Sequence, residues 1–232
     1  MTPGTLLLGG DDHGLPADVT TAARDELRAR RQLAVVTYAA TNADDAAQAA
    51  VERFADTPAA PCPLPDSADA SRILAGSDAI YVADGDVFRL LRTLRGHGLV
   101  ELIRELIVRR GAPYLGVGAG AQAAGASLHT THQLSHQHHG GDTQALNLLP
   151  FELHTGFIDE PVRDVAPGWR EAQAILATLE HHPSRVLALR PGSWLQRDPT
   201  GLVLVGRYGA VLFERDRSRN LAPGPIGHLF TR

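Results

Sequence analysis

The chain has 232 residues, of which 44% are hydrophobic and 21% charged, so it carries enough apolar side chains for one sizeable core. Its formal net charge of −4 and its pI of about 6.2 give no electrostatic reason to expect a nucleic acid or an anionic membrane as a partner. We therefore expect a single domain over residues 1–232 whose partner is a small molecule or a short peptide, with a homodimer as an option.

The number of cysteines and the length of the apolar runs indicate the cellular compartment. Cys62 is the only cysteine in the sequence, so no internal disulfide can form. The opening Met-Thr-Pro-Gly lacks a basic segment followed by an apolar run, and no apolar run reaches the roughly 18 to 20 residues of a membrane span. These features predict a cytoplasmic protein.

Short apolar runs alternate with helical patterns along the chain. This alternation is typical of an α/β fold, in which a doubly wound, mostly parallel sheet is flanked by helices. The expected strands are Thr5–Leu8, Leu33–Tyr38, Ala79–Ala83, Tyr114–Val117, Pro150–His154, Val186–Leu189, Trp194–Arg197, Leu202–Val205 and Ala210–Phe213. Turn residues separate the last four, which predicts antiparallel strands at the C-terminal end of the sheet.

Helical spacing of apolar residues predicts several helices. They cover Ala17–Arg31, Asn42–Phe54, Leu99–Arg110 and Trp169–His181, and an Asn or Asp cap is expected to open the second. The Pro-rich segment Thr57–Pro65 is predicted as an irregular connection or a short edge strand. The His-rich segment Ser127–Asn147 is predicted as a loop.

The stretch Tyr114–Gly125 is the centre of the functional question. An apolar strand runs into a glycine-spaced turn, and an alanine-rich helix follows, which is the context in which a G-x-S-x-G elbow presents its nucleophilic serine. Gly118 stands at the serine position. Glycines at 116, 118 and 120 allow a sharp turn and close packing of the helix on the strand. The sequence thus predicts the geometry of an elbow without its nucleophile.

Motifs that span nearly the whole chain resemble one family. In chain order they are Asp86–Leu91, Gly116–Gly120, His129–His132, Ala145–Phe151 with His154 behind it, and Gly192–Leu195. Together they resemble the peptidase E, or aspartyl dipeptidase, family. The resemblance implies a sheet related to that of the class I glutamine amidotransferases and a Ser-His-Asp or Ser-His-Glu site at the carboxyl ends of its strands. It also implies cleavage of small peptides that begin with aspartate.

Transferred residue by residue, the resemblance indicates an altered site. The family's serine falls on Gly118, which cannot form an acyl-enzyme, and its acidic residue falls on the uncharged Gln133. Its histidine falls on His154. The family's Gly-Gly-Asn turn becomes Asp84-Gly85-Asp86, so two carboxylates stand where anionic charge is normally stabilised. The expected substrate-binding residues are Asp84, Gly85, Asp86, Gly118, Ala119 and Gln133.

The replacements suggest a metal-dependent hydrolase. His154, with His129 or His132 and a carboxylate from Asp84 or Asp86, has the side chains that bind a divalent metal, with zinc as the first choice. Such an ion lowers the pKa of bound water to about 7 and so supplies a nucleophile without a serine. In this reading the catalytic residues are His154 and Glu152, because Glu152 or the second Asp would take the proton from that water.

Two other readings stay open. The chain could be a catalytically inactive pseudo-peptidase that is retained as a binding or scaffold protein, or a peptidase with a displaced nucleophile. His136, His138 and His139 form either a solvated loop or a lid that carries ligands. Asp11, Asp12 and His13 either line the site or cap the following helix. The remaining histidines are interpreted as structural, namely His97, His181, His182 and His228.

Overall fold

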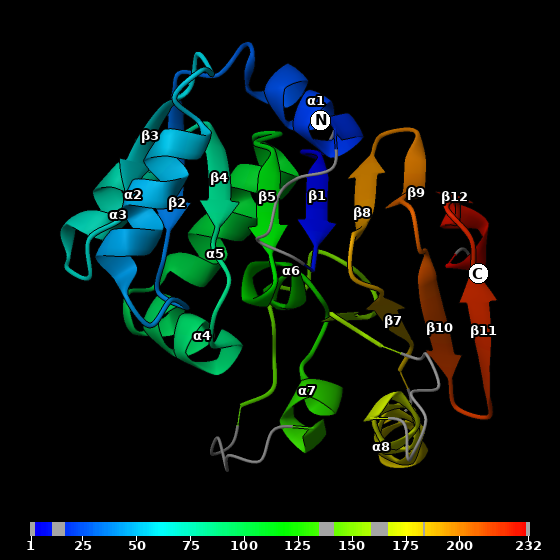
Figure 1. Cartoon of the computed structure of the whole chain (residues 1–232). Helices are drawn as coiled ribbons and strands as arrows, with labels where there is room; N and C mark the ends of the chain where they lie inside the picture. The colour runs from blue at the N-terminus through cyan, green and yellow to red at the C-terminus, as the bar shows by residue number, and fades with distance from the viewer. Residues whose placement is uncertain (1–2, 11–16, 135–141, 159–166, 183, 231–232) are drawn as a thin grey trace.

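The computed structural model describes the chain except for residues 1–2, 11–16, 135–141, 159–166, 183 and 231–232 (Figure 1). Its central feature is an eight-stranded sheet in the order β12-β9-β8-β1-β5-β4-β2-β3. The strands are β1 (Leu6–Gly9), β2 (Gln32–Val36), β3 (Ala60–Pro63), β4 (Ala79–Val82), β5 (Tyr114–Val117), β8 (Ser193–Asp198), β9 (Gly201–Gly206) and β12 (Gly224–Pro225). The first five are parallel to their neighbours in this group, and β8, β9 and β12 are added antiparallel.

A second sheet has four strands in the order β11-β10-β7-β6. They are β6 (Glu152–Thr155), β7 (Val186–Leu189), β10 (Ala210–Glu214) and β11 (Arg217–Leu221). The β6–β7 pair is parallel and the other two pairs are antiparallel. The predicted α/β fold with antiparallel strands near the C-terminus is confirmed. The expectation that all strands join one sheet is wrong, because the chain leaves β7 through a turn at Gly192 (φ 73°) and enters β8 in the central sheet.

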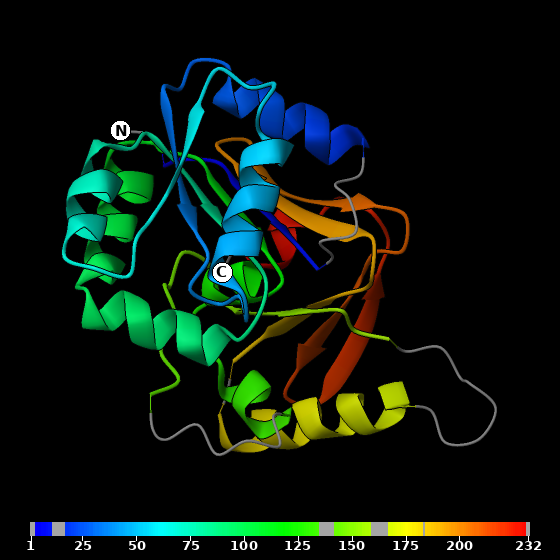
Figure 2. The ribbon, with the colours of Figure 1, turned by 60° about the vertical axis from the view of Figure 1, so that its left-hand side comes forward.

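Helices cover both faces of the central sheet. The helices of the described chain are α1 (Ala17–Leu27), α2 (Ala43–Arg53), α3 (Asp69–Gly76), α4 (Val87–Gly96), α5 (Leu99–Arg104), α6 (Ala119–Ala123), α7 (His129–Leu134) and α8 (Pro167–His181), with a π-helical turn η1 at Glu105–Arg109 and a 3-10 turn η2 at Gly227–Leu229. Of these, α7 contacts β6 and α8 contacts β10 of the second sheet. Figure 2 shows α1 and α2 on one side of the sheet and α3, α4 and α5 on the other.

Alternation of side chains along the strands builds a core on each face. On β1, Leu7 packs with residues of α1 and α2, whereas Leu6 and Leu8 pack with residues of α3, α4 and α5. A third cluster lies under α8, where Ile175 and Leu179 cover the second sheet. Among the described residues, every helix is too short or too polar to span a bilayer.

The local predictions succeeded where capping and periodicity agree. The side chain of Asn42 accepts a hydrogen bond from Asp45 N and so begins α2 as predicted. The segment Thr57–Pro65 contains the edge strand β3, one of the two alternatives. Three details differ from the predictions: α1 ends at Leu27, the helix predicted to Arg110 becomes π-helical from Glu105, and the predicted loop Ser127–Asn147 contains α7.

Candidate functional site

The predicted elbow is present at the carboxyl end of β5. Gly118 is buried between Val117 and the first residue of α6, and its φ of 50° and ψ of −109° form the sharp turn that such an elbow requires. Its N–H donates to Gly9 O over 2.8 Å, which fixes the turn to the end of β1. Figure 1 shows α6 directly beyond the ends of β1 and β5. Gly118 therefore stands where a nucleophilic side chain would be presented.

The side chain of Asp84 occupies this elbow. Asp84 follows β4, and its Oδ1 accepts hydrogen bonds from Gly85 N over 2.7 Å and from Ala119 N over 2.8 Å. The N–H group after a nucleophile, paired with a second backbone N–H, is the usual construction of an oxyanion hole. A Cβ atom built on Gly118 would lie closer than 3.0 Å to Asp84 Oδ1, Cγ and Oδ2. One carboxylate thus occupies both N–H donors and the space for a side chain at position 118.

Gly85 and Asp86 hold the turn that presents this carboxylate. Gly85 has a φ of 141°, and a Cβ there would collide with the carbonyl of Ala39 in the loop after β2. Asp86 begins α4, since its Oδ1 accepts from Phe88 N over 2.9 Å and from Arg89 N over 3.0 Å. The geometry therefore gives Asp86, predicted as a metal ligand, a helix-capping role.

His154 lies on the other side of β6 from the elbow. Leu153 packs in the core that contains α6, and Gln122 of α6 donates to Thr155 Oγ1 over 3.0 Å. Side chains alternate along a strand, so His154 faces the opposite way, where its Nε2 lies 2.7 Å from Glu171 Oε1 of α8. His154, which was expected to converge on Gly118, is thus directed towards Glu171 of α8 in this structure.

Glu152 shares that face and holds α7 in place. Its side chain is 2% exposed and accepts hydrogen bonds from Ser127 Oγ over 2.7 Å, Thr130 N over 3.0 Å and Ser184 Oγ over 3.5 Å. A buried carboxylate with three donors is a strong structural anchor. These contacts give Glu152, predicted as a proton acceptor, a position at the start of α7 rather than beside Gly118.

His129 and His132 are one helical turn apart on α7, but their rings contact different elements. His129 stacks on His182 with ring centroids 4.0 Å apart, while His132 packs edge-on against Phe88 at 6.0 Å. Burial lowers the pKa of His129 below its usual value, and the neighbouring His182 lowers it further. The predicted ligands His129, His132 and His154 therefore point to three separate neighbours.

No metal centre is formed within the described part of the chain, where no group of three or more His, Cys, Asp or Glu side chains could hold an ion. Several candidates lie outside that part: Asp11, Asp12, His13, His136, His138, His139 and the side chain of Gln133. The zinc site thus stays a prediction. Of the histidines interpreted as structural, His97 ends α4 and its Nε2 lies 2.6 Å from Asp66 Oδ1.

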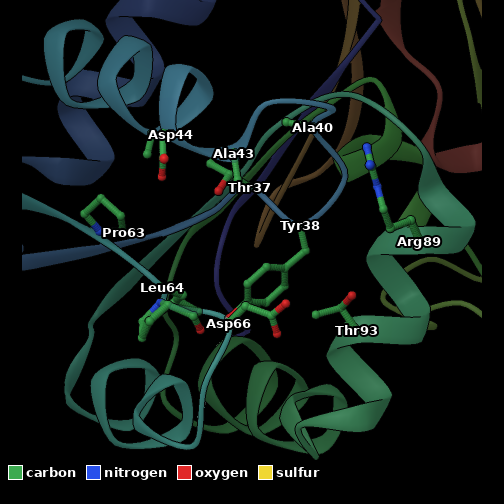
Figure 3. A pocket seen from close by; sticks show the side chains of 12 residues that line it. Thr37, Tyr38, Ala40, Ala43, Asp44, Pro63, Leu64, Asp66, Arg89 and Thr93 are labelled. Atoms are coloured by element: carbon green, nitrogen blue, oxygen red, sulfur yellow. Dashed lines mark hydrogen bonds between the residues drawn. The ribbon is translucent and has the colours of Figure 1, made fainter.

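A cavity of about 450 Å³, which the sequence did not predict, lies at the carboxyl ends of β2 and β3 (Figure 3). Thr37 and Tyr38 follow β2, Leu64 and Asp66 follow β3, and α2 and α4 supply the remaining walls. Their position directly after apolar strand runs was the available signal, because ligands of open α/β sheets bind at that edge.

Comparison with known proteins identifies the family. The family model described as Peptidase family S51 matches residues 6–205. The chain is 32% identical over 156 residues to a Drosophila melanogaster protein named Probable alpha-aspartyl dipeptidase, covering 67% of this chain and 65% of that protein. It is 35% identical over 149 residues to Peptidase E of Streptomyces coelicolor, covering 64% of this chain and 60% of that protein. The matched region thus spans somewhat less than two thirds of either relative.

The fold agrees with this assignment. The crystal structure of a peptidase from an acI-B1 Actinobacterium superposes with a TM-score of 0.66 at 16% identity, over 95% of this chain and 98% of that chain. At this identity the likeness concerns the fold alone. The family match over most of the chain and the shared architecture lead to one conclusion: the chain belongs to peptidase family S51.

Proposed function

We propose that this chain is a peptidase E-like protein without a serine nucleophile, retained to bind a small molecule or a short peptide rather than to cleave it. The observation that carries the proposal is the Asp84 carboxylate at the elbow. Acyl transfer requires a nucleophile and free N–H donors for the developing oxyanion. Gly118 offers no nucleophilic side chain, and Asp84 already accepts from both Gly85 N and Ala119 N.

The Asp84 carboxylate also opposes acyl transfer at the elbow through its charge. A substrate carbonyl that entered the elbow would develop negative charge beside an existing carboxylate, which raises the barrier instead of lowering it. His154 would give no help there, because it is paired with Glu171 on the opposite face of β6.

The metal-dependent hydrolase predicted from the sequence is a separate proposal. It would use a bound divalent ion, with zinc as the first choice, to activate water in place of the serine. The described residues supply no ligand cluster in its favour. It therefore requires ligands from the segments that contain His13 or His136, His138 and His139, and a metal analysis of untagged protein tests it independently.

Hydrolysis of aspartyl-leucine by the purified, untagged chain tests the main proposal. The assay is run as purified, with added zinc, and with a chelator. We expect no release of leucine above the protein-free rate in any of the three. Hydrolysis that the chelator abolishes would replace the proposal with the metal-dependent enzyme. Hydrolysis that survives the chelator would show that another side chain serves as nucleophile.

A further inference from the structure

Strand β11 forms one edge of the second sheet and presents an open row of backbone groups. Among the described residues it pairs only with β10, and Figure 1 shows it at the outer margin of the molecule. A two-residue turn joins the two strands, so Glu214 and Arg217 exchange hydrogen bonds as the first pair of the ladder. Hydrogen-bonded and non-hydrogen-bonded pairs alternate from there. The backbone N–H and C=O groups of Ser218 and Asn220 therefore point away from β10, towards the open side.

Three arginines gather around one carboxylate at this end of the sheet. Arg217 Nε lies 2.7 Å from Glu214 Oε2, and Arg219 Nη2 lies 3.4 Å from the same oxygen. Arg185 Nε lies 3.4 Å from Glu214 Oε1. A hydrogen bond from Arg217, together with the three positive charges, keeps the pKa of Glu214 below its usual value, so this carboxylate is ionised at neutral pH. It balances one of the three charges, and the turn Arg215-Asp216 adds no net charge.

The surplus positive charge faces solvent. The side chain of Glu214 is only 15% exposed, whereas those of Arg185, Arg217 and Arg219 are 43%, 64% and 40% exposed. The buried Nε of Arg219 has no hydrogen-bond acceptor among the described residues, so the cluster holds more donors than acceptors. Arg217 and Arg219 are two positions apart on the strand and lie on one face of the sheet. Acceptors that match both would have the same spacing.

We propose that β11 is a docking edge for an extended acidic segment of a partner protein, which adds to the second sheet as a further strand. In this mode of recognition the backbone hydrogen bonds supply affinity, and side chains at alternate positions supply selectivity. Acidic residues at every second position of the segment would lie across from Arg217 and Arg219, where opposite charges stabilise a strand pair.

The arginines also disfavour a second copy of this chain as the occupant. Pairing of two β11 edges would bring like charges together, and charged side chains on edge strands normally prevent such self-pairing. An acidic segment turns the same charges into attraction. The inference goes beyond the proposed function and does not depend on it, because it uses none of the residues of the elbow.

An NMR titration of the isotope-labelled full chain with the peptide acetyl-Thr-Glu-Val-Glu-Val-Glu-Thr-amide tests this edge. The same peptide with glutamine in place of each glutamate is the matched probe. We expect saturable binding of the acidic peptide, and binding of the glutamine peptide weaker by about tenfold or more. Arg217→Gln and Arg219→Gln should each weaken binding of the acidic peptide by about threefold. Arg92→Gln, at an exposed position of α4, is the control and should leave the affinity unchanged.

Ser218→Pro separates strand addition from general attraction of anions. Proline removes the outward N–H of residue 218 and no hydrogen bond to β10, so the charges stay while binding should weaken by about fivefold or more. In the wild-type chain, saturation with the acidic peptide should slow hydrogen exchange of the Ser218 and Asn220 amides.

Four results would overturn the inference. They are absence of saturable binding, equal binding of the two peptides, unweakened binding by Ser218→Pro, and a loss in Arg92→Gln equal to that in Arg217→Gln. Unchanged exchange of the Ser218 and Asn220 amides in the saturated wild-type chain would likewise contradict strand addition, whatever the stability of the proline variant.

Discussion

The carboxylate of Asp84 and the Cα of Gly118 share one site: a Cβ at residue 118 would overlap the Asp84 carboxylate, which itself accepts a hydrogen bond from Ala119 N. The absence of a side chain at 118 and the presence of a carboxylate at 84 are thus two parts of one arrangement. Each makes the other sterically permissible. The relationship predicts that the two positions respond to mutation as a pair.

Gly118→Ser is expected to restore no peptidase activity and to lower the free energy of unfolding by about 2 kcal/mol or more, because of the overlap and the φ of 50°. In an Asp84→Gly background the same change should cost at least about 1 kcal/mol less. Urea unfolding of the four proteins in this cycle measures the coupling. Additive losses would show that the two side chains do not compete for one space.

Asp84 itself should stabilise the elbow. Asp84→Ala leaves Gly85 N and Ala119 N without their acceptor, so we expect a loss of about 1 to 3 kcal/mol in the free energy of unfolding. Asp84→Asn keeps an oxygen in place and should lose less than half as much. Thermal and urea unfolding check both variants. A more stable Asp84→Ala protein would mean that the carboxylate is not bound at the elbow.

Glu152 provides a test of structural against catalytic roles. Glu152→Ala should cost about 2 to 4 kcal/mol in unfolding free energy, since Thr130 N and the Ser127 hydroxyl lose a buried acceptor. Glu152→Gln, which keeps one acceptor oxygen, should cost less. The control is Glu180→Gln at an exposed position of α8, for which a change within about 0.5 kcal/mol is expected. Equal stability of wild type and Glu152→Ala would contradict the anchoring role.

The burial of His129, together with its neighbour His182, should make the stability depend on pH. The pKa of His129 is lowered in the folded state, so at a pH below the unfolded value of about 6.5 the unfolded chain binds more protons than the folded one. The contribution is fully present above that value and is lost as the pH falls through the folded pKa. His129→Phe keeps an aromatic ring and should flatten the decline in stability between about pH 7 and pH 5. An unchanged slope would mean that His129 does not titrate in this way.

The features of the fold that the sequence predicted are those that depend on residues close together in the chain. The alternation of apolar runs predicted the central strands, and the glycine spacing predicted the elbow at Gly118, because both depend on neighbours in sequence. The division into two sheets depends on the pairing of β6 with β7, which the segment from Gly156 to Arg185 separates in sequence. No local pattern fixes such a pairing.

The candidate site was harder to predict because it depends on the direction of side chains. A family motif placed His154 at the elbow, yet the apolar Leu153 beside it was a period-two signal that His154 faces away. The carboxylate of Asp84 was expected near the elbow, but its hydrogen bonds to Gly85 N and Ala119 N follow from tertiary packing of β4 against β5. The cavity at the carboxyl ends of β2 and β3 likewise brings together loops from separate strands.

Labelling by a serine-directed fluorophosphonate is the most direct test for a nucleophile at the elbow, where we expect none. The purified chain is incubated with excess reagent, and its intact mass is measured with a serine peptidase as the positive control. We expect an unmodified mass under conditions that label the control completely. One adduct per chain, mapped by peptide analysis to a residue beside Gly118, would contradict it.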